Sequence, residues 1–170
     1  HGRCAEACPT QAIVVSTGGT SHRVEVPDVD TDFQSNVPGI YIVGELGGRG
    51  LIKNAINEGR LAVESIARRL PPGAPRSDGD EGAVDVAIVG SGPAGLSAAL
   101  EAHASGLSYV VLEQGTLADT VQRYPRHKLL LAEPVTIPLY GELWIADATK
   151  ETLVEVWKNI VERTGLVVHT

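Results

Sequence analysis

The sequence predicts an α/β protein in which a parallel sheet carries helices on both faces and a short accessory segment precedes the sheet. Two observations predict this class. Short apolar runs alternate with longer stretches of helical periodicity after residue 84, which is typical of strands connected by crossover helices. Glycine accounts for 19 of the 170 residues and clusters between the apolar runs, which indicates tight turns where strands end.

The overall composition excludes several classes of protein. Hydrophobic residues make up 43% and charged residues 21% of the chain, which indicates a folded core. A formal net charge of -7 argues against nucleic acid or an acidic membrane surface as partner. The sequence has neither an apolar run of about 18 residues nor the apolar centre of a signal peptide, so we expect a cytoplasmic protein. Methionine is absent, even at position 1, and we therefore expect a piece of a longer chain.

Composition divides the chain into four segments. The first is polar and rich in turns, the second reads as strand, glycine loop and helix, the third is a linker of prolines, glycines and acids, and the fourth has a β-α-β pattern. Their bounds are 1–35, 36–70, 71–83 and 84–170.

Within the second segment, the apolar run 40–43 predicts a short buried strand, and the glycine loop 44–50 follows it. Apolar residues at helical spacing then predict a helix over 51–70, which Pro71 ends. In the fourth segment we expect two or three short strands within 114–145. The other elements expected there are strand 84–89, helix 94–104, strand 109–112, helix 150–163 and strand 166–168.

One motif connects this pattern to a ligand. The run Gly90-Ser91-Gly92-Pro93-Ala94-Gly95 fits G-x-G-x-x-G, follows an apolar strand and opens a helix. Gly90 permits the turn, Gly92 lets a pyrophosphate approach the backbone, and Gly95 lets helix and strand pack closely. The helix N-terminus would then face the phosphates.

An acidic residue completes the motif. Glu113 ends the next strand 23 residues after Gly90, where a ribose-binding acid is expected, and Gln114 beside it is a further candidate contact. These residues predict a Rossmann-like dinucleotide site. The alternative is a glycine-rich turn without a ligand and a solvated Glu113.

Residues 84–170, which begin VDVAIVGSGPAGLSAAL, resemble the first flavin-binding segment of thioredoxin-reductase-like pyridine nucleotide flavoproteins, and in particular their bacillithiol-disulfide-reductase branch. This resemblance implies FAD as cofactor and NAD(P)H as electron donor. It also implies a second flavin contact, from a strand that ends in Gly-Asp or Gly-Glu and precedes a helix. Residues 36–70 are similar to that motif, which implies that Gly44 and Glu45 contact FAD and that Glu45 binds the ribityl hydroxyls.

The two flavin motifs occur in the reverse of the order that the resemblance implies. In one arrangement the sheet is permuted, with strand order 166–168, 109–112, 85–89 and 40–43, and both motifs serve one FAD. In the other, the motifs belong to separate flavin sites in successive modules or in two subunits. We expect the first arrangement, because it buries both strands and completes a single site.

The cysteines suggest a second cofactor. Cys4 and Cys8 are the two cysteines of the chain, and the run from Cys4 through Cys8-Pro9 resembles the end of a bacterial ferredoxin motif. The resemblance implies a ferredoxin-like remnant and a 4Fe-4S cluster in the intact parent protein, although two thiolates alone cannot hold it. The alternative is a pair of ordinary thiols.

Three functions remain open on these grounds. The first is an FAD-dependent oxidoreductase segment that passes electrons between a nicotinamide donor and an iron–sulfur relay or disulfide-type acceptor. The flavin reacts, so no side chain is assigned as catalytic. The second is a dinucleotide-binding module without turnover, and the third is an electron-carrier fragment. The chain has no C-x-x-C and no second G-x-G-x-x-G, so a nicotinamide domain is expected outside it, and a homodimer stays open.

Overall fold

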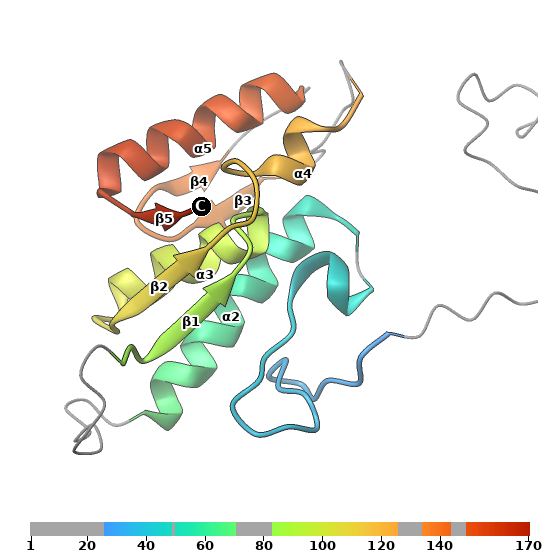
Figure 1. Cartoon of the computed structure of the whole chain (residues 1–170), viewed down its shortest axis with the longest axis vertical. Helices are drawn as coiled ribbons and strands as arrows, with labels where there is room; N and C mark the ends of the chain where they lie inside the picture. Colours follow the sequence, from blue (N-terminus) through green and yellow to red (C-terminus); the bar gives the residue numbers. More distant parts are fainter. Residues whose placement is uncertain (1–25, 49, 71–82, 126–133, 144–148) are drawn as a thin grey trace, which may run out of the picture.

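The computed structural model describes residues 26–48, 50–70, 83–125, 134–143 and 149–170 (Figure 1). Its central sheet contains three parallel strands, β1 (Val86–Val89), β2 (Tyr109–Leu112) and β5 (Val168–His169), in the order β1-β2-β5. Val86 lies opposite Tyr109, and Val111 lies opposite Val168. The predicted α/β class with a parallel, Rossmann-like sheet is confirmed.

A single β-α-β unit forms the centre of this fold. Helix α3 (Pro93–Ala104) connects β1 to β2, with Pro93 in its first turn, where a missing N–H costs nothing. The chain turns back to the sheet at Gly106, whose φ of 69° favours glycine. This unit places the glycine loop at the carboxyl end of β1, the edge at which open α/β sheets hold ligands.

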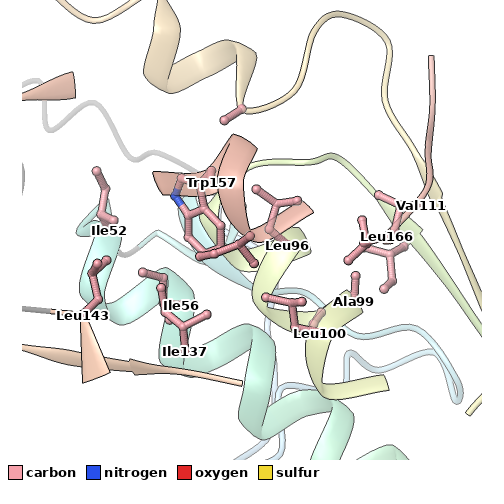
Figure 2. Close-up of a cluster of buried hydrophobic side chains, with 14 of the residues drawn as sticks. Ile52, Ile56, Leu96, Ala99, Leu100, Val111, Ile137, Leu143, Trp157 and Leu166 are labelled. Carbon is pink, nitrogen blue, oxygen red and sulfur yellow. The ribbon is translucent and has the colours of Figure 1, made fainter. Parts of the chain in front are cut away.

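The second half of the chain covers the same core. Helix α4 (Asp119–Gln122) leads to an antiparallel hairpin of β3 (Val135–Ile137) and β4 (Gly141–Leu143). Helix α5 (Lys150–Thr164) begins after Thr149, whose hydroxyl accepts the N–H of Thr152 at 3.4 Å. Buried side chains from the sheet, the hairpin and the helices form one apolar cluster around Trp157 (Figure 2).

Helix α2 (Ile52–Arg69) packs directly on α3. The two backbones approach so closely at Gly59 that an added Cβ would lie 2.1 Å from the carbonyl oxygen of Ala94. The contact brings segment 36–70 against the glycine loop.

The predicted strand 40–43 was wrong in its pairing. Tyr41 forms an isolated antiparallel bridge with Gln34, and the N–H of Ile42 donates to the carbonyl of Phe33 at 2.9 Å. Phe33 adopts a φ of 66°, so the chain folds back on itself, and the backbone groups of this run bond to residues 33–35 instead of β1. Among the described strands, β1 pairs with β2 alone. Gly44–Gly47 then form the short 3-10 helix η1.

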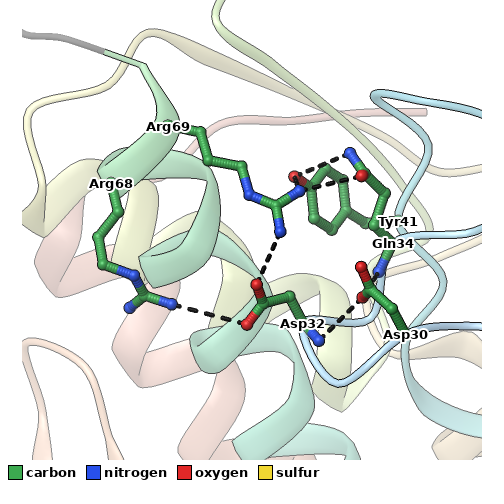
Figure 3. Close-up of polar contacts among 6 residues, drawn as sticks. All are labelled: Asp30, Asp32, Gln34, Tyr41, Arg68 and Arg69. Carbon is green, nitrogen blue, oxygen red and sulfur yellow. Dashed lines mark hydrogen bonds and ion pairs between the residues drawn. The ribbon is translucent and has the colours of Figure 1, made fainter.

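Arg69 at the end of α2 holds this folded-back run in place (Figure 3). Its guanidinium donates to Asp32 at 2.7 Å, to Gln34 at 3.0 Å and to the hydroxyl of Tyr41 at 3.1 Å. Arg68 adds a longer ion pair to Asp32 at 3.8 Å. The hydrogen bond to Asp32 raises the pKa of Arg69. The residues before Gly44 are thus tied to the helix that follows it.

The two sheet faces differ in their cover. The described helices pack on the face that carries Val86, Ile88 and Val111, all buried. On the other face Val89 is 86% exposed. We expected helices on both faces of the sheet, and the described helices cover one of them. None of the described helices combines the length and the apolar character needed to cross a membrane.

Candidate functional site

The glycine loop has the backbone geometry that its motif predicts. Gly90 adopts a φ of 97°, which a residue with a side chain rarely adopts. An added Cβ at Gly95 would lie 1.9 Å from the carbonyl oxygen of Gly90, so only glycine allows α3 to begin this close to the strand. Gly92, by contrast, adopts a φ of -71°, and no atom of the described residues lies within 4 Å of an added Cβ. Its neighbourhood is open, as a site for a ligand would be.

The N-terminus of α3 faces the same open region. Gly92 is its N-cap and provides no side chain to accept the first N–H groups, and the first turn carries no acid. The helix itself therefore carries no acidic side chain in its first turn that would offset its partial positive charge. Such an end favours an anionic group.

Glu113 bonds to the glycine loop itself. Its Oε2 accepts the N–H of Ser91 at 2.8 Å and the hydroxyl of Ser91 at 2.7 Å, and its Oε1 accepts the N–H of Gly115 at 2.9 Å. The N–H of Ser91 is the main cause of a lowered pKa of Glu113. The Ser91 hydroxyl and the N–H groups of Gly115 and Gln114 also lower the pKa of Glu113, whereas its partial burial raises it. The carboxylate is thus held ionised, and Gln114 beside it is exposed.

This lowered pKa predicts a pH-dependent contribution of Glu113 to stability. A carboxyl whose pKa is lower in the folded state stabilises the protein above its unfolded pKa of about 4.3, and the contribution disappears as the pH falls through the folded value. We expect Glu113→Gln to lower the melting temperature at pH 7 and to approach the wild type below about pH 4. Thermal unfolding across this pH range measures the difference. Glu142→Gln, an exposed carboxyl on β4, is the control, and an E113Q deficit that is constant with pH would contradict the prediction.

The second motif lies against the first. Gly44 is buried, adopts a φ of 75°, and donates its N–H to Glu58 Oε2 at 2.8 Å. An added Cβ at Gly44 would lie 3.0 Å from the Cβ of Ala94 and 3.7 Å from that of Ala55. Gly44 therefore contacts the glycine motif directly, although 50 residues separate it from Ala94.

Both motifs line one cavity of about 790 Å³. Glu45 and Tyr124 lie on its wall. Burial, and then the charge of Glu45, raise the pKa of the Tyr124 phenol, which places that carboxylate near the ring. Ser91, Glu113 and Gln114 do not line the cavity. The predicted site residues that do line it are Gly44, Glu45, Gly90, Gly92, Pro93, Ala94 and Gly95.

Three residues of this region were not predicted from the sequence. Glu58 is buried on α2 and fixes Gly44, Gly59 permits the contact between α2 and α3, and Tyr124 contributes to the cavity wall. A glycine inside a helical pattern is a sequence signal for close packing, and Gly59 carried that signal. Glu58 and Tyr124 had no comparable signal, because their roles depend on tertiary neighbours.

The predicted metal ligands cannot be placed in this site. Cys4 and Cys8 lie outside the described residues. Within the described ranges, no group of three or more His, Cys, Asp or Glu side chains could hold a metal ion. The iron–sulfur cluster stays a prediction.

Comparison with known proteins points to redox enzymes. Residues 87–154 match the family model described as pyridine nucleotide-disulphide oxidoreductase. The chain is 34% identical over 93 residues to an alkyl hydroperoxide reductase component of Pseudomonas aeruginosa, an alignment that covers 51% of this chain and 16% of that protein. It is 25% identical over 79 residues to bacilliredoxin reductase of Bacillus subtilis, covering 45% and 24%. No solved structure matches the chain.

The matched region begins in β1, includes α3, β2, Glu113, α4 and the β3-β4 hairpin, and ends in the first turns of α5. The chain spans less than a quarter of the length of both relatives. Their names describe reductases, and the family model describes oxidoreductases. By its fold and its sequence, this part of the chain is similar to a segment of pyridine nucleotide-disulphide oxidoreductases.

Proposed function

We propose that this chain forms the FAD site of a flavin oxidoreductase, and that both of its motifs serve one FAD. The observation that carries the proposal is the contact of Gly44 with Ala94, beside a cavity that residues of both motifs line. A volume of about 790 Å³ lies within the range of about 300 to 1,000 Å³ that is usual for ligand pockets.

The residues around the cavity fit the parts of FAD. The bare N-terminus of α3 suits a diphosphate, and Gly92 leaves space for it at the backbone. Glu45 is an exposed carboxylate on the cavity wall, suited to accept hydrogen bonds from ribityl hydroxyls. Glu113 does not line the cavity, but it is held ionised beside the glycine loop, where it is suited to accept a hydroxyl of the adenosine ribose. When bound, the flavin would supply hydride and electron transfer, while these residues bind and orient it.

The electron donor in this proposal is a nicotinamide nucleotide, and the acceptor is an iron–sulfur relay or a disulfide-type group. The match to pyridine nucleotide-disulphide oxidoreductases and the names of the two reductases support this direction of flow. A 4Fe-4S cluster would need thiolates besides Cys4 and Cys8, and iron and sulfide analysis of the intact parent protein is the measurement that decides it.

The test is titration of the purified chain with FAD. We expect one FAD per monomer, retained through gel filtration. Glu45→Gln should weaken FAD binding by about tenfold, because a hydrogen bond to a carboxylate contributes about 1.5 kcal/mol. Glu142→Gln, on the β3-β4 hairpin, is the matched control and should bind as the wild type does.

Three results would count against the proposal. A wild-type chain that stays colourless in excess FAD rejects the FAD site. A dimer that binds two FAD molecules, while the monomer binds none, indicates that each site combines motifs of different protomers. FAD that binds but accepts no electrons from NADH or NADPH, even in the intact parent protein, favours the dinucleotide-binding module without turnover.

A further inference from the structure

Ser91 connects three segments around the glycine loop. It is fully buried, and its hydroxyl donates to Glu113 Oε2 at 2.7 Å while accepting the N–H of Ala118 at 3.2 Å. The carbonyl of Ser91 accepts the same N–H at 3.2 Å. Ala118 is itself buried, with a φ of 54°. The Ser91 hydroxyl therefore holds the end of β2 and the turn before α4 against the loop.

These contacts use the two carboxylate oxygens of Glu113 unequally. A carboxylate oxygen offers about two lone-pair directions. Oε2 accepts two hydrogen bonds, both from Ser91. Oε1 accepts a hydrogen bond from the N–H of Gly115. The N–H of Gln114 also acts on the carboxylate, and Glu113 is half-buried, so a ligand can reach the exposed part of its side chain.

We propose that Ser91 is a positioning residue that holds Glu113 Oε2 with two hydrogen bonds and thereby orients the carboxylate towards a hydroxyl of a nucleotide ribose. The inference deepens the proposed function and rests on it for the presence of a nucleotide in the site. It assigns to Ser91 the orientation of the ribose acceptor, a role that the glycine motif itself does not require.

The geometry distinguishes this role from a structural one. Loss of the hydroxyl leaves the N–H of Ser91 on Oε2 but removes the second of the two Ser91 hydrogen bonds that orient the carboxylate. The affinity for ligands with ribose hydroxyls should fall, and the affinity for a ligand that lacks them should stay. A merely structural hydroxyl would weaken both ligands equally.

The experiment measures the dissociation constants of ADP and of 2',3'-dideoxy-ADP for the full 170-residue chain. The wild type should prefer ADP by about tenfold, the value of one hydrogen bond to a charged group. Ser91→Ala and Ser91→Gly should reduce this preference to about threefold or less, because the carboxylate has lost one of the two Ser91 hydrogen bonds that orient it. Ser97→Ala is the matched control, because Ser97 is also fully buried and its hydroxyl has no partner among the described residues.

Each outcome decides the inference. A preference that persists in both Ser91 variants, or that falls equally in S97A, overturns it, as does a wild type that binds both ligands alike. Circular dichroism shows whether a variant is folded, and Ser91→Gly introduces no new atoms that could clash. If the preference depends on Ser91 while FAD fails to bind the wild type, the inference holds and the proposed FAD site fails.

Discussion

Replacement of Gly59 by alanine is expected to lower the free energy of unfolding by about 2 kcal/mol and to abolish retention of FAD. The added Cβ would lie 2.1 Å from the carbonyl oxygen of Ala94, a backbone atom that cannot move without displacing α3. Overpacking of this kind costs about 1–3 kcal/mol or more, and exceeds the gain of about 1 kcal/mol that alanine brings to a helix interior. Urea denaturation followed by circular dichroism measures the loss.

A second substitution on the same helix separates the two effects. Asn54→Ala lies on α2 and keeps the helix propensity effect without the contact to Ala94. It should leave stability unchanged or slightly raised and should leave FAD binding intact. If Gly59→Ala proved as stable as the wild type, then α2 and α3 would not be packed as described.

Gly92→Ala is expected to have a different profile, with stability retained and affinity for FAD reduced by about tenfold or more. The backbone of Gly92 has a φ of -71°, which alanine adopts freely, and in the part of the chain that the structure describes an added Cβ meets no atom within 4 Å. In the proposed complex, however, that Cβ would occupy space taken by the diphosphate at the start of α3. Isothermal titration with FAD and thermal unfolding of the same preparation measure the two quantities.

Comparison of the two glycine variants tests the site as a whole. Gly59→Ala should lower both the stability and the affinity for FAD, whereas Gly92→Ala should lower only the affinity for FAD. Equal FAD affinity of Gly92→Ala and wild type would mean that the diphosphate does not lie at this helix end. A loss of stability in Gly92→Ala would mean that the open region around this position is filled in solution.

The β-α-β unit could be predicted from sequence because its signals are local. Gly90 and Gly95 are required by the turn and by contacts with residues five positions away, and Pro93 and Gly106 mark the two ends of α3. Apolar runs long enough to form strands lie before Gly90 and after Gly106. Chain-local chemistry of this kind can be read without knowledge of the rest of the fold.

The pairing of residues 40–43 could not be predicted in the same way. The run Ile40-Tyr41-Ile42-Val43 is apolar enough for a buried strand, but its partners depend on Phe33 and on the hydrogen bonds of Arg69. The same limit applies to Glu113, whose place after a strand was predictable, whereas its bonds to Ser91 depend on how the loop closes. Contacts made across the fold decided both cases.

The contact between α2 and α3 also has a kinetic consequence. Gly59 and Ala94 are separated by 35 positions in the sequence, so the two halves of the cavity can meet early, at a modest loop-closure cost in chain entropy. Short sequence separation between touching elements favours rapid folding. Because α2 precedes the glycine loop in the chain, the ribosome would release α2 before α3. The apolar side of nascent α2 would therefore be exposed to solvent until α3 emerged.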